Sequence, residues 1–389
     1  AAERGLRTLL VEKNRKPGVK ILMSGGTRCN LTHAADARGI VEAFGPQGKF
    51  LHSALRALSP QSLVELVEAE GVATKVEPGG KIFPASDRAL DVQRALVRYA
   101  EQSGAALALG EPLVDLAPAA PGFRLVTAAR ELAADAVVLA TGGKSYPGCG
   151  TTGDGYALAA RLGHTIVPPR PALTPITTLA PWVKELQGIT VPDVHLRVVD
   201  GGRALAQRRG SFLFAHFGLS GPVALDVSRA VSGHPKPRQL RLLCNFLPGL
   251  ARPEFDASLA AECRAAGKRQ AAALLEPRLP RRLVDALLAL ASIPPDRRAA
   301  ELSGHERRRL LDAVFDLPIE PTGTLGFEKA EVTAGGVSLD EVDSRTMESK
   351  RVPGLHLVGE LLDLDGPIGG YNFQSAFSTG WLAGGRTRT

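Results

Sequence analysis

Apolar residues along the chain follow two periods, one typical of helices and one typical of buried strands. Helical spacing covers residues 59–71 and 88–103, and short apolar runs cover residues 7–12, 123–127 and 135–140. The helical and strand-like segments alternate. This alternation predicts an α/β sheet.

The pattern changes near residue 168, where prolines cluster. Two strand-like runs then flank the glycine pair at 201–202, which is typical of a β-hairpin. Strand-like runs continue at residues 211–214 and 239–246, and residues 254–317 are mostly helical. The sequence therefore predicts a small β-rich insert that is followed by helices.

Glycine-rich loops and a buried strand at 355–358 return after residue 330. We expect this C-terminal part to complete the α/β domain that the insert interrupts. The predicted boundaries are 1–170 for the first part of the α/β domain, 171–329 for the β-rich and helical insert, and 330–389 for the last part.

The composition is that of a globular chain: 44% of its 389 residues are hydrophobic and 22% are charged. No apolar run approaches the roughly 20 residues that a membrane-spanning helix needs, so we expect no membrane association. The net charge of +7 comes mostly from arginines spread along the chain, and the densest basic cluster, at 278–282 and 307–309, contains no interleaved aromatic residues. The pattern therefore argues against nucleic-acid binding.

The four cysteines, Cys29, Cys149, Cys244 and Cys263, form neither a C-x-x-C motif nor a metal-type spacing. This argues against a metal site or a disulfide framework and favours a reducing, cytoplasmic location. The sequence has no signal peptide, and it begins at Ala1, without Met, in helix-like sequence. We therefore expect the natural start to lie farther upstream.

Glu12 ends the first predicted strand. A carboxylate at such a position can accept hydrogen bonds from both ribose hydroxyls of an adenosine, whereas an exposed acid at a strand end is the alternative interpretation. In dinucleotide-binding folds a strand and a G-x-G-x-x-G turn stand roughly 20 residues ahead of this acid. That position falls ahead of residue 1, so we expect the first strand and its glycine motif to be missing from this sequence.

A polar, glycine-rich loop, SGGTRCN, follows at residues 24–30. Its adjacent glycines, Gly25 and Gly26, allow backbone N–H groups to approach an anion, and Arg28 can neutralise the charge of a pyrophosphate. A surface loop is the alternative. For Cys29, a buried and inert thiol is favoured over a redox-active one.

The strand predicted at 136–140 runs into glycine-rich residues, and residues 148–153 form a literal G-x-G-x-x-G. This motif does not open a helix directly after a strand, so the sequence disfavours an NAD site here. We expect the glycines at 142–143 to keep the backbone close to a ligand at the carboxyl edge of the sheet, and residues 152–155 to begin the next helix.

The strongest pattern lies near the C-terminus. A buried strand leads into Gly359 and Glu360, and a glycine-rich turn at 366–370 precedes a helix that we expect to begin near Asn372. The N-terminus of a helix carries roughly half a positive charge and free N–H groups, which would stabilise the negative charge that builds up near N1 of a reduced flavin. The segment therefore indicates a flavin site.

Four ordered runs, SGGTRCNLTH, LATGGKSYPGCGTTGDGY, FAHFGLSGP and the C-terminal stretch from AEVTAGGV to GPIGGYNFQSAFSTGWLAG, resemble the BaiN/RdsA-type (YhiN-type) bacterial NAD(P)/FAD-dependent oxidoreductases. The resemblance extends over essentially the whole chain. It implies a two-dinucleotide-binding, Rossmann-like FAD domain of the α/β class with an inserted β-barrel and a helical subdomain. It also implies FAD as the cofactor and NAD(P)H as a transient electron donor.

The resemblance further implies cofactor contacts at matching positions. The adenosine end would meet Glu12 and Lys13, and the pyrophosphate and flavin side would meet Ser24, Gly25, Gly26, Arg28, Cys29 and Asn30. Thr141, Gly142 and Gly143 would line the site, and the ribitol and isoalloxazine would be held by Gly359, Glu360, Asp363, Gly369, Gly370, Tyr371, Asn372 and Gln374. Thr27 departs from the pattern, because similar sequences often have Gly there.

His216, in the run FAHFGLSGP, is the candidate proton donor of the insert, because an imidazole titrates in the useful pH range. A structural, hydrogen-bonded histidine is the alternative. Ser220 lies in G-L-S-G-P, which lacks the last glycine of a nucleophile elbow, so the motif does not support a hydrolase.

The sequence thus predicts an FAD-dependent oxidoreductase that reduces a small organic molecule with electrons from NAD(P)H. Two alternatives stay open: a flavoprotein that binds or modifies RNA, because the chain is basic, and a flavin-binding sensor without turnover. No residue pattern identifies the substrate, the preferred nicotinamide or the oligomeric state.

Overall fold

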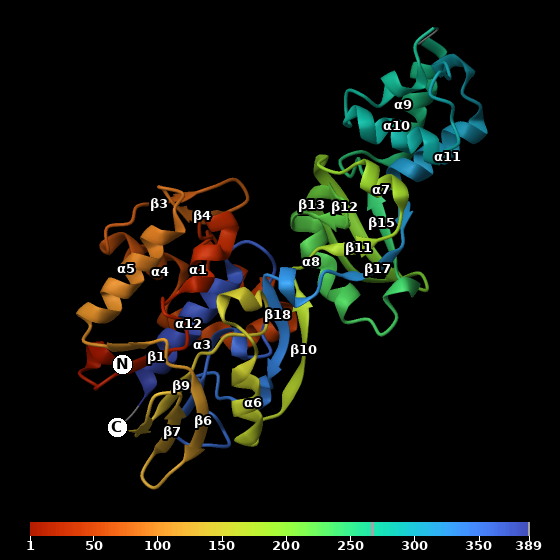
Figure 1. The fold of residues 1–389 in the computed structure, drawn as a ribbon. Helices are drawn as coiled ribbons and strands as arrows, with labels where there is room; N and C mark the ends of the chain where they lie inside the picture. The colour runs from red at the N-terminus through yellow and green to blue at the C-terminus, as the bar shows by residue number, and fades with distance from the viewer. Residues whose placement is uncertain (266–267, 388–389) are drawn as a thin grey trace. The chain divides into compact units, whose positions relative to one another are not determined.

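The computed structural model describes residues 1–265 and 268–387, and it divides into two compact units. The first unit comprises Ala1–Pro171 and Glu331–Thr389, and the second comprises Ala172–Ala330. Figure 1 shows the elements of each unit as ribbons.

Two pairs of parallel strands position the glycine-rich loops of the first unit. β1 (Leu9–Glu12) pairs with β5 (Ala106–Leu109), and β9 (Val137–Leu139) pairs with β19 (Leu355–Leu357). Parallel neighbours run in the same direction, so they end at the same edge of a sheet. The loops that follow β9 and β19 therefore leave the sheet at a common edge.

Three further sheets complete the strands of this unit. Their orders are β2-β4-β3, β6-β7-β8 and β10-β18. The strands are β2 (Thr32–His33), β3 (Thr74–Val76), β4 (Lys81–Pro84), β6 (Leu113–Pro118), β7 (Phe123–Thr127), β8 (Glu131–Ala134), β10 (Ile166–Ala172), whose last residue begins the second unit, and β18 (Val332–Val337).

Helices pack around these strands. They are α1 (Val19–Met23), α2 (Ala37–Ala43), α3 (His52–Ala57), α4 (Pro60–Ala69), α5 (Ala89–Gln102), α6 (Asp154–Arg161) and α12 (Tyr371–Arg386). α4 and α5 confirm the two helices that apolar spacing predicts. Leu63 and Val67 of α4 and Val92 and Ala95 of α5 belong to one core cluster, because residues three or four apart share a helix face.

The second unit is built on a seven-stranded sheet with the order β16-β15-β12-β13-β14-β11-β17. The strands are β11 (Ile176–Thr178), β12 (Thr190–Asp200), β13 (Arg203–Ala215), β14 (Gly218–Ser220), β15 (Arg241–Asn245), β16 (Leu317–Ile319) and β17 (Pro321–Thr324). β12 and β13 form the predicted hairpin, whose turn residues Gly201 and Gly202 have φ angles of 53° and 89°. Positive φ at both turn residues is what a tight hairpin requires.

This sheet corrects the expectation of an inserted β-barrel. Its edge strands, β16 and β17, are not paired with each other among the described residues, so the sheet is open. The two edge strands are nevertheless consecutive in the chain and are separated only by Glu320. The sheet must therefore curl strongly enough for one residue to connect its two edges. Pro318 and Pro321 are tolerated because edge strands need fewer backbone donors.

Helices complete the second unit. They are α7 (Pro181–Glu185), α8 (Gly221–Ser232), α9 (Arg252–Ala265), α10 (Arg281–Leu290) and α11 (Gly304–Phe315). α8 contacts β12 and β13, and Figure 1 shows α9, α10 and α11 gathered beyond one end of the sheet. Phe212, Phe214 and Phe246 pack ring against ring in the core, with 5.0 Å between the centroids of the first two.

Across the part of the chain that the structure describes, no helix combines the length and hydrophobicity needed to cross a bilayer. Within the same residues, no group of His, Cys, Asp and Glu side chains has an arrangement suited to a metal ion.

The Glu341 carboxylate joins His164 and Thr165, which immediately precede β10, to Arg351 in the segment before β19. It accepts hydrogen bonds from the Thr165 backbone N–H and hydroxyl, both at 2.8 Å, from the Arg351 guanidinium, and it lies 3.2 Å from His164 Nδ1. The Arg351 guanidinium is the main cause that lowers the pKa of Glu341 to about 2.

Replacing Glu341 with Gln is expected to lower the free energy of unfolding by about 2 kcal/mol at neutral pH. Because the folded pKa lies below the unfolded value, this contribution is complete above about pH 4.5 and is lost as the pH falls toward 2. Urea titrations at several pH values should show the difference between the two proteins narrowing below that pH. Glu42→Gln, which alters the exposed pair with Arg38, should have no measurable effect; a gap that does not change with pH would contradict the assignment.

Candidate functional site

The edge where β9 and β19 end is held together by the carboxylate of Glu360. Glu360 Oε1 accepts hydrogen bonds from Ser145 Oγ at 2.7 Å and from the Thr333 N–H at 2.8 Å. Glu360 Oε2 lies 3.3 Å from Lys20 Nζ, which also donates to Ser145 Oγ at 2.7 Å. One half-buried carboxylate thus joins α1, the loop after β9, β18 and the loop after β19. We call these four residues the Glu360 network.

Gly143 makes room for this network. A Cβ at Gly143 would lie 2.5 Å from Thr333 Oγ1 and 2.9 Å from Glu360 Oε1. Thr333 Oγ1 also accepts the N–H groups of Lys144 and Ser145, at 2.8 and 3.0 Å. The structure therefore gives Gly143 a close packing contact with protein atoms.

Three members of the Glu360 network, Lys20, Ser145 and Thr333, are missed by the sequence analysis. Ser145 and Thr333 lie within runs that carry the family resemblance, and Lys20 lies four residues ahead of another such run. The resemblance is the only sequence signal for them. Polar residues in loops have no periodicity, so their meeting depends on how distant segments fold together.

The loop at residues 24–30 has a left-handed backbone at several positions. The φ angles are 56° at Gly25, 67° at Gly26, 70° at Thr27 and 65° at Cys29. Left-handed residues turn successive N–H groups toward one side, which creates an anion-binding concavity. Thr27 adopts a conformation that strains a residue with a β-branched side chain and that glycine would adopt without strain.

Cys29 is buried, and burial raises the pKa of its thiol to about 12. The thiol therefore stays protonated at neutral pH, as expected for an inert cysteine.

The N-terminus of α12 lies against this loop. With its side-chain amide oriented to satisfy both ends, Asn30 accepts the Gly370 N–H at 3.0 Å and donates to the Thr32 carbonyl at 3.1 Å. A Cβ at Gly370 would lie 2.4 Å from the carbonyl carbon of Thr32, so only glycine permits this approach. Residues 24–30 and 369–372, which lie far apart in the sequence, are therefore neighbours.

Two further contacts strengthen the same junction. His33 Nδ1 lies 3.1 Å from the Gly369 carbonyl, and the His33 ring stacks on Tyr371 with 4.5 Å between centroids. Thr32 Oγ1 donates to Gln374 Oε1 at 2.5 Å. Gln374 is fully buried and its amide also donates to the Leu58 carbonyl, so its side chain serves packing.

α12 begins without a side-chain cap. The N-cap position is Gly370, and Asn372, in the first turn, accepts the Gly366 N–H at 2.8 Å and donates to the Gly366 carbonyl at 3.0 Å. An uncapped helix N-terminus keeps N–H groups and partial positive charge for an anion or an electron-rich ring.

Glu12, the acid at the end of β1, is linked to the glycine-rich loop at residues 148–153 through Lys13 and Asn14. The Glu12 carboxylate accepts the Asn14 N–H at 2.7 Å, and Asn14 Nδ2 donates to the Cys149 carbonyl at 3.0 Å. Lys13 Nζ donates to Thr152 Oγ1 at 2.7 Å and pairs with Asp154. The literal G-x-G-x-x-G therefore packs beside the end of β1, and residue 154 begins α6, close to the expected helix start.

Arg28 has other partners than the predicted pyrophosphate. Its Nη1 donates to Glu77 at 2.7 Å and to Asp87 at 3.2 Å, and its guanidinium carbon lies 4.1 Å from the centroid of the Phe83 ring. Glu77 is the main cause that raises the pKa of Arg28. The carboxylates of Glu77 and Asp87 thus pair with the guanidinium charge of Arg28, for which a pyrophosphate partner was predicted from the sequence.

The remaining predicted residues of the first unit occupy the same edge or its flank. The Gly359 N–H donates to Thr379 Oγ1 of α12 at 3.0 Å. Burial, together with the charge of Asp365, raises the pKa of Asp363. The Thr141 hydroxyl is buried without a hydrogen-bond partner among the described residues. Gly142 has a φ angle of 72°, as a tight turn after β9 requires.

His216 belongs to the second unit. It lies in the turn between β13 and β14, where its ring is exposed and meets the edge of Phe217 with 4.9 Å between centroids. It stays a candidate.

These features suit an elongated, phosphate-bearing cofactor such as FAD. A left-handed loop, an uncapped helix N-terminus and an orphaned buried hydroxyl are groups that such a cofactor can satisfy. The first two are in direct contact, so one ligand can reach both.

Gly370→Ala is expected to destabilise the protein by about 3 kcal/mol, because φ at this position is 93° and the new Cβ would collide with the Thr32 backbone. Gly380→Ala, in the same helix, is the matched control. A Cβ at Gly380 meets nothing within 4 Å, so this change should stabilise by about 0.5–1 kcal/mol. Urea unfolding of both variants measures the contrast, and equal responses would contradict the junction.

Known proteins resemble the chain over nearly its whole length. Residues 1–386 match the family model described as the HI0933-like protein Rossmann domain. The chain is 35% identical over 384 residues to a ribosomal RNA dihydrouridine synthase of Escherichia coli, an alignment that covers 98% of this chain and 92% of the relative. It is 32% identical over 383 residues to a 3-dehydro-bile acid delta(4,6)-reductase of Clostridium scindens, covering 97% of this chain and 92% of the relative. This chain therefore belongs to the HI0933-like Rossmann-domain family of FAD-dependent oxidoreductases.

Proposed function

We propose that this chain is an FAD-dependent reductase that takes electrons from NADH or NADPH and saturates a carbon–carbon double bond conjugated to a carbonyl group. The observation that carries the proposal is the contact between the loop at 24–30 and the N-terminus of α12. Both segments offer backbone N–H groups to one elongated, negatively charged ligand.

The kind of bond follows from the chemistry that two relatives share. Dihydrouridine is uridine with its ring double bond saturated, and a delta(4,6)-reductase of a 3-dehydro compound acts on double bonds conjugated to the 3-oxo group. In both cases hydrogen is added to an electron-poor C=C bond. Membership in an oxidoreductase family also favours turnover over a flavin sensor.

Bound FAD would supply the hydride transfer that reduces such a bond. The N–H groups of residues 24–30 would face its phosphates, and the first turn of α12 would face the electron-rich side of the flavin. Glu12 would accept hydrogen bonds from the adenosine ribose. The Glu360 network would keep the loops after β9 and β19 at the distance that this cofactor needs.

The sequence favours a small organic molecule as substrate. A uridine within ribosomal RNA is the second candidate, supported by the names of two relatives and by the net charge of +7. The second of these relatives, from Haemophilus influenzae, is 30% identical over 386 residues.

The purified full-length protein is expected to take up added FAD and to show flavin absorption bands that bleach under anaerobic conditions with NADH or NADPH. The reduced protein should then be reoxidised by a conjugated enone such as 2-cyclohexenone or by uridine-containing ribosomal RNA, but not by isolated alkenes. A folded full-length protein that binds no FAD would refute the proposal. Reoxidation by oxygen alone, with neither substrate class accelerating it, would refute the assigned bond type.

His216 is our candidate for the group that protonates the substrate carbon. His216→Asn should lower the rate of substrate reduction about 100-fold while leaving flavin reduction by NAD(P)H unchanged, because the proton is needed only in the second half-reaction. His52→Asn, which removes another exposed imidazole, is the control. Stopped-flow traces of both half-reactions separate the two effects, and an unchanged second half-reaction in the His216 variant would assign the proton to another donor.

A further inference from the structure

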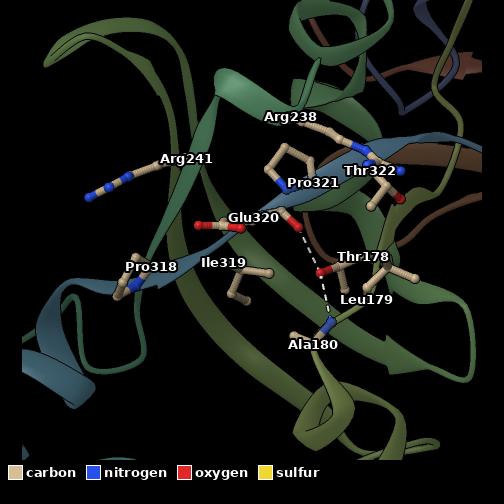
Figure 2. A pocket seen from close by; sticks show the side chains of 10 residues that line it. All are labelled: Thr178, Leu179, Ala180, Arg238, Arg241, Pro318, Ile319, Glu320, Pro321 and Thr322. Atoms are coloured by element: carbon tan, nitrogen blue, oxygen red, sulfur yellow. Dashed lines mark hydrogen bonds between the residues drawn. The ribbon is translucent and has the colours of Figure 1, made fainter. Parts of the chain in front are cut away.

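A cavity of about 540 Å³ lies within the second unit, where the two edges of the curled sheet part. Its lining comes from the end of β11, the start of β15 and the β16–β17 connection, and Figure 2 shows these side chains. The lining residues are Thr178, Leu179, Ala180, Arg238, Arg241, Pro318, Ile319, Glu320, Pro321 and Thr322.

The two arginines of this cavity are exposed, and their side chains have no hydrogen-bond or ion-pair partner among the described residues. The same holds for the exposed side chains of Arg203 and Lys236. Unpaired guanidinium groups keep their full charge for an external anion. We call Arg203, Lys236, Arg238 and Arg241 the basic rim.

Strand register and one side-chain contact gather the basic rim at a single end of the sheet. Val199 of β12 is opposite Arg241, and the next residue, Asp200, is opposite Arg203. The Cα atoms of the two arginines are therefore two strand spacings, or roughly 10 Å, apart at one end of the sheet, and their side chains leave its opposite faces. His234 Nε2 lies 3.3 Å from Asp200 Oδ2, which brings the segment containing Lys236 to the same hairpin tip. η5 (Pro237–Gln239) contacts β17 and places Arg238 on the other side of the cavity.

The arginine cluster that stands out in the sequence behaves differently. Arg281 pairs with Glu276 and Asp285, and Arg307 pairs with Asp256. Arg282 and Arg309 donate to backbone carbonyls. The arginines of this cluster therefore have partners within the protein, whereas the side chains of the basic rim have none among the described residues.

The arrangement suits an extended anion. Figure 2 shows the two guanidinium groups of the cavity pointing to opposite sides of Glu320 and Pro321, so they cannot clamp a single phosphate together. They suit separate phosphates of one chain. The Glu320 carboxylate between them would repel a phosphate but can accept a hydrogen bond from a ribose hydroxyl or a base amino group. Leu179, which is 77% exposed, adds an apolar surface beside them.

We infer that the basic rim binds the phosphodiester backbone of an RNA strand. The inference rests on the second candidate of the proposed function, RNA as the substrate, and assigns its binding surface to the second unit. It adds an RNA contact that is independent of the flavin site of the first unit.

The test is fluorescence anisotropy of the full-length protein with a labelled, uridine-containing single-stranded oligoribonucleotide at several salt concentrations. Arg238→Ser combined with Arg241→Ser should weaken binding roughly tenfold or more at low salt and reduce the slope of log K against log salt by about 1.4, because two phosphate contacts are lost. Arg281→Ser combined with Arg307→Ser is the matched control, since it removes the same charge from paired positions, and it should leave the slope unchanged. Circular dichroism confirms that each variant is folded.

Three outcomes would overturn the inference. The first is that the wild-type protein binds no RNA at 50 mM salt. The second is that the control variant loses as much RNA affinity as the Arg238→Ser, Arg241→Ser variant. The third is that this rim variant keeps its RNA affinity and instead shows a higher KM for NADPH. Binding is measured without turnover, and reduction of 2-cyclohexenone is measured without RNA. Failure of the RNA surface is therefore distinguishable from failure of the reductase function.

Discussion

The approach of the Gly370 backbone to the Thr32 carbonyl is the constraint on which the geometry of the first unit depends. It holds the N-terminus of α12 against the loop at residues 24–30, and no side chain larger than hydrogen fits between them. Gln374, one turn later, bonds to Thr32 and so fixes the rotation of the helix as well as its position. The loop and the first turn of α12 are consequently in contact, although more than 300 residues separate them.

Glu360 provides the second fixed point of this unit. A carboxylate that is removed from water loses solvation energy unless other groups interact with it. Here Lys20, the Ser145 hydroxyl and the Thr333 N–H interact with the Glu360 carboxylate in place of water. The glycines near Glu360 are consequently required for different reasons. Gly359 and Gly142 adopt left-handed backbones, whereas Gly143 leaves space that Thr333 and Glu360 fill. Density of glycine in a loop therefore does not by itself indicate contact with a ligand.

The sequence was sufficient to predict elements that a periodic apolar pattern or a pair of turn glycines marks. Apolar periodicity located α4 and α5, and paired glycines located the β12–β13 hairpin. It was insufficient where partners come from distant loops. The carboxylates that neutralise Arg28 lie 49 and 59 residues away and carry no pattern that points to it. The strand-like runs likewise predicted a β-rich insert without deciding whether the edges of its sheet pair. The most conspicuous arginine cluster is the one whose charges are already paired.

The single-residue connection through Glu320 has a mechanical consequence for the second unit. The edge strands β16 and β17 are connected covalently through Glu320, but no ladder of backbone hydrogen bonds joins them among the described residues. Moving β16 away from β17 would thus break no interstrand hydrogen bond between them, whereas the covalent connection through Glu320 keeps their adjacent ends together. The cavity beside the Glu320 connection is therefore bordered by two strand edges that backbone hydrogen bonds do not join to each other among the described residues.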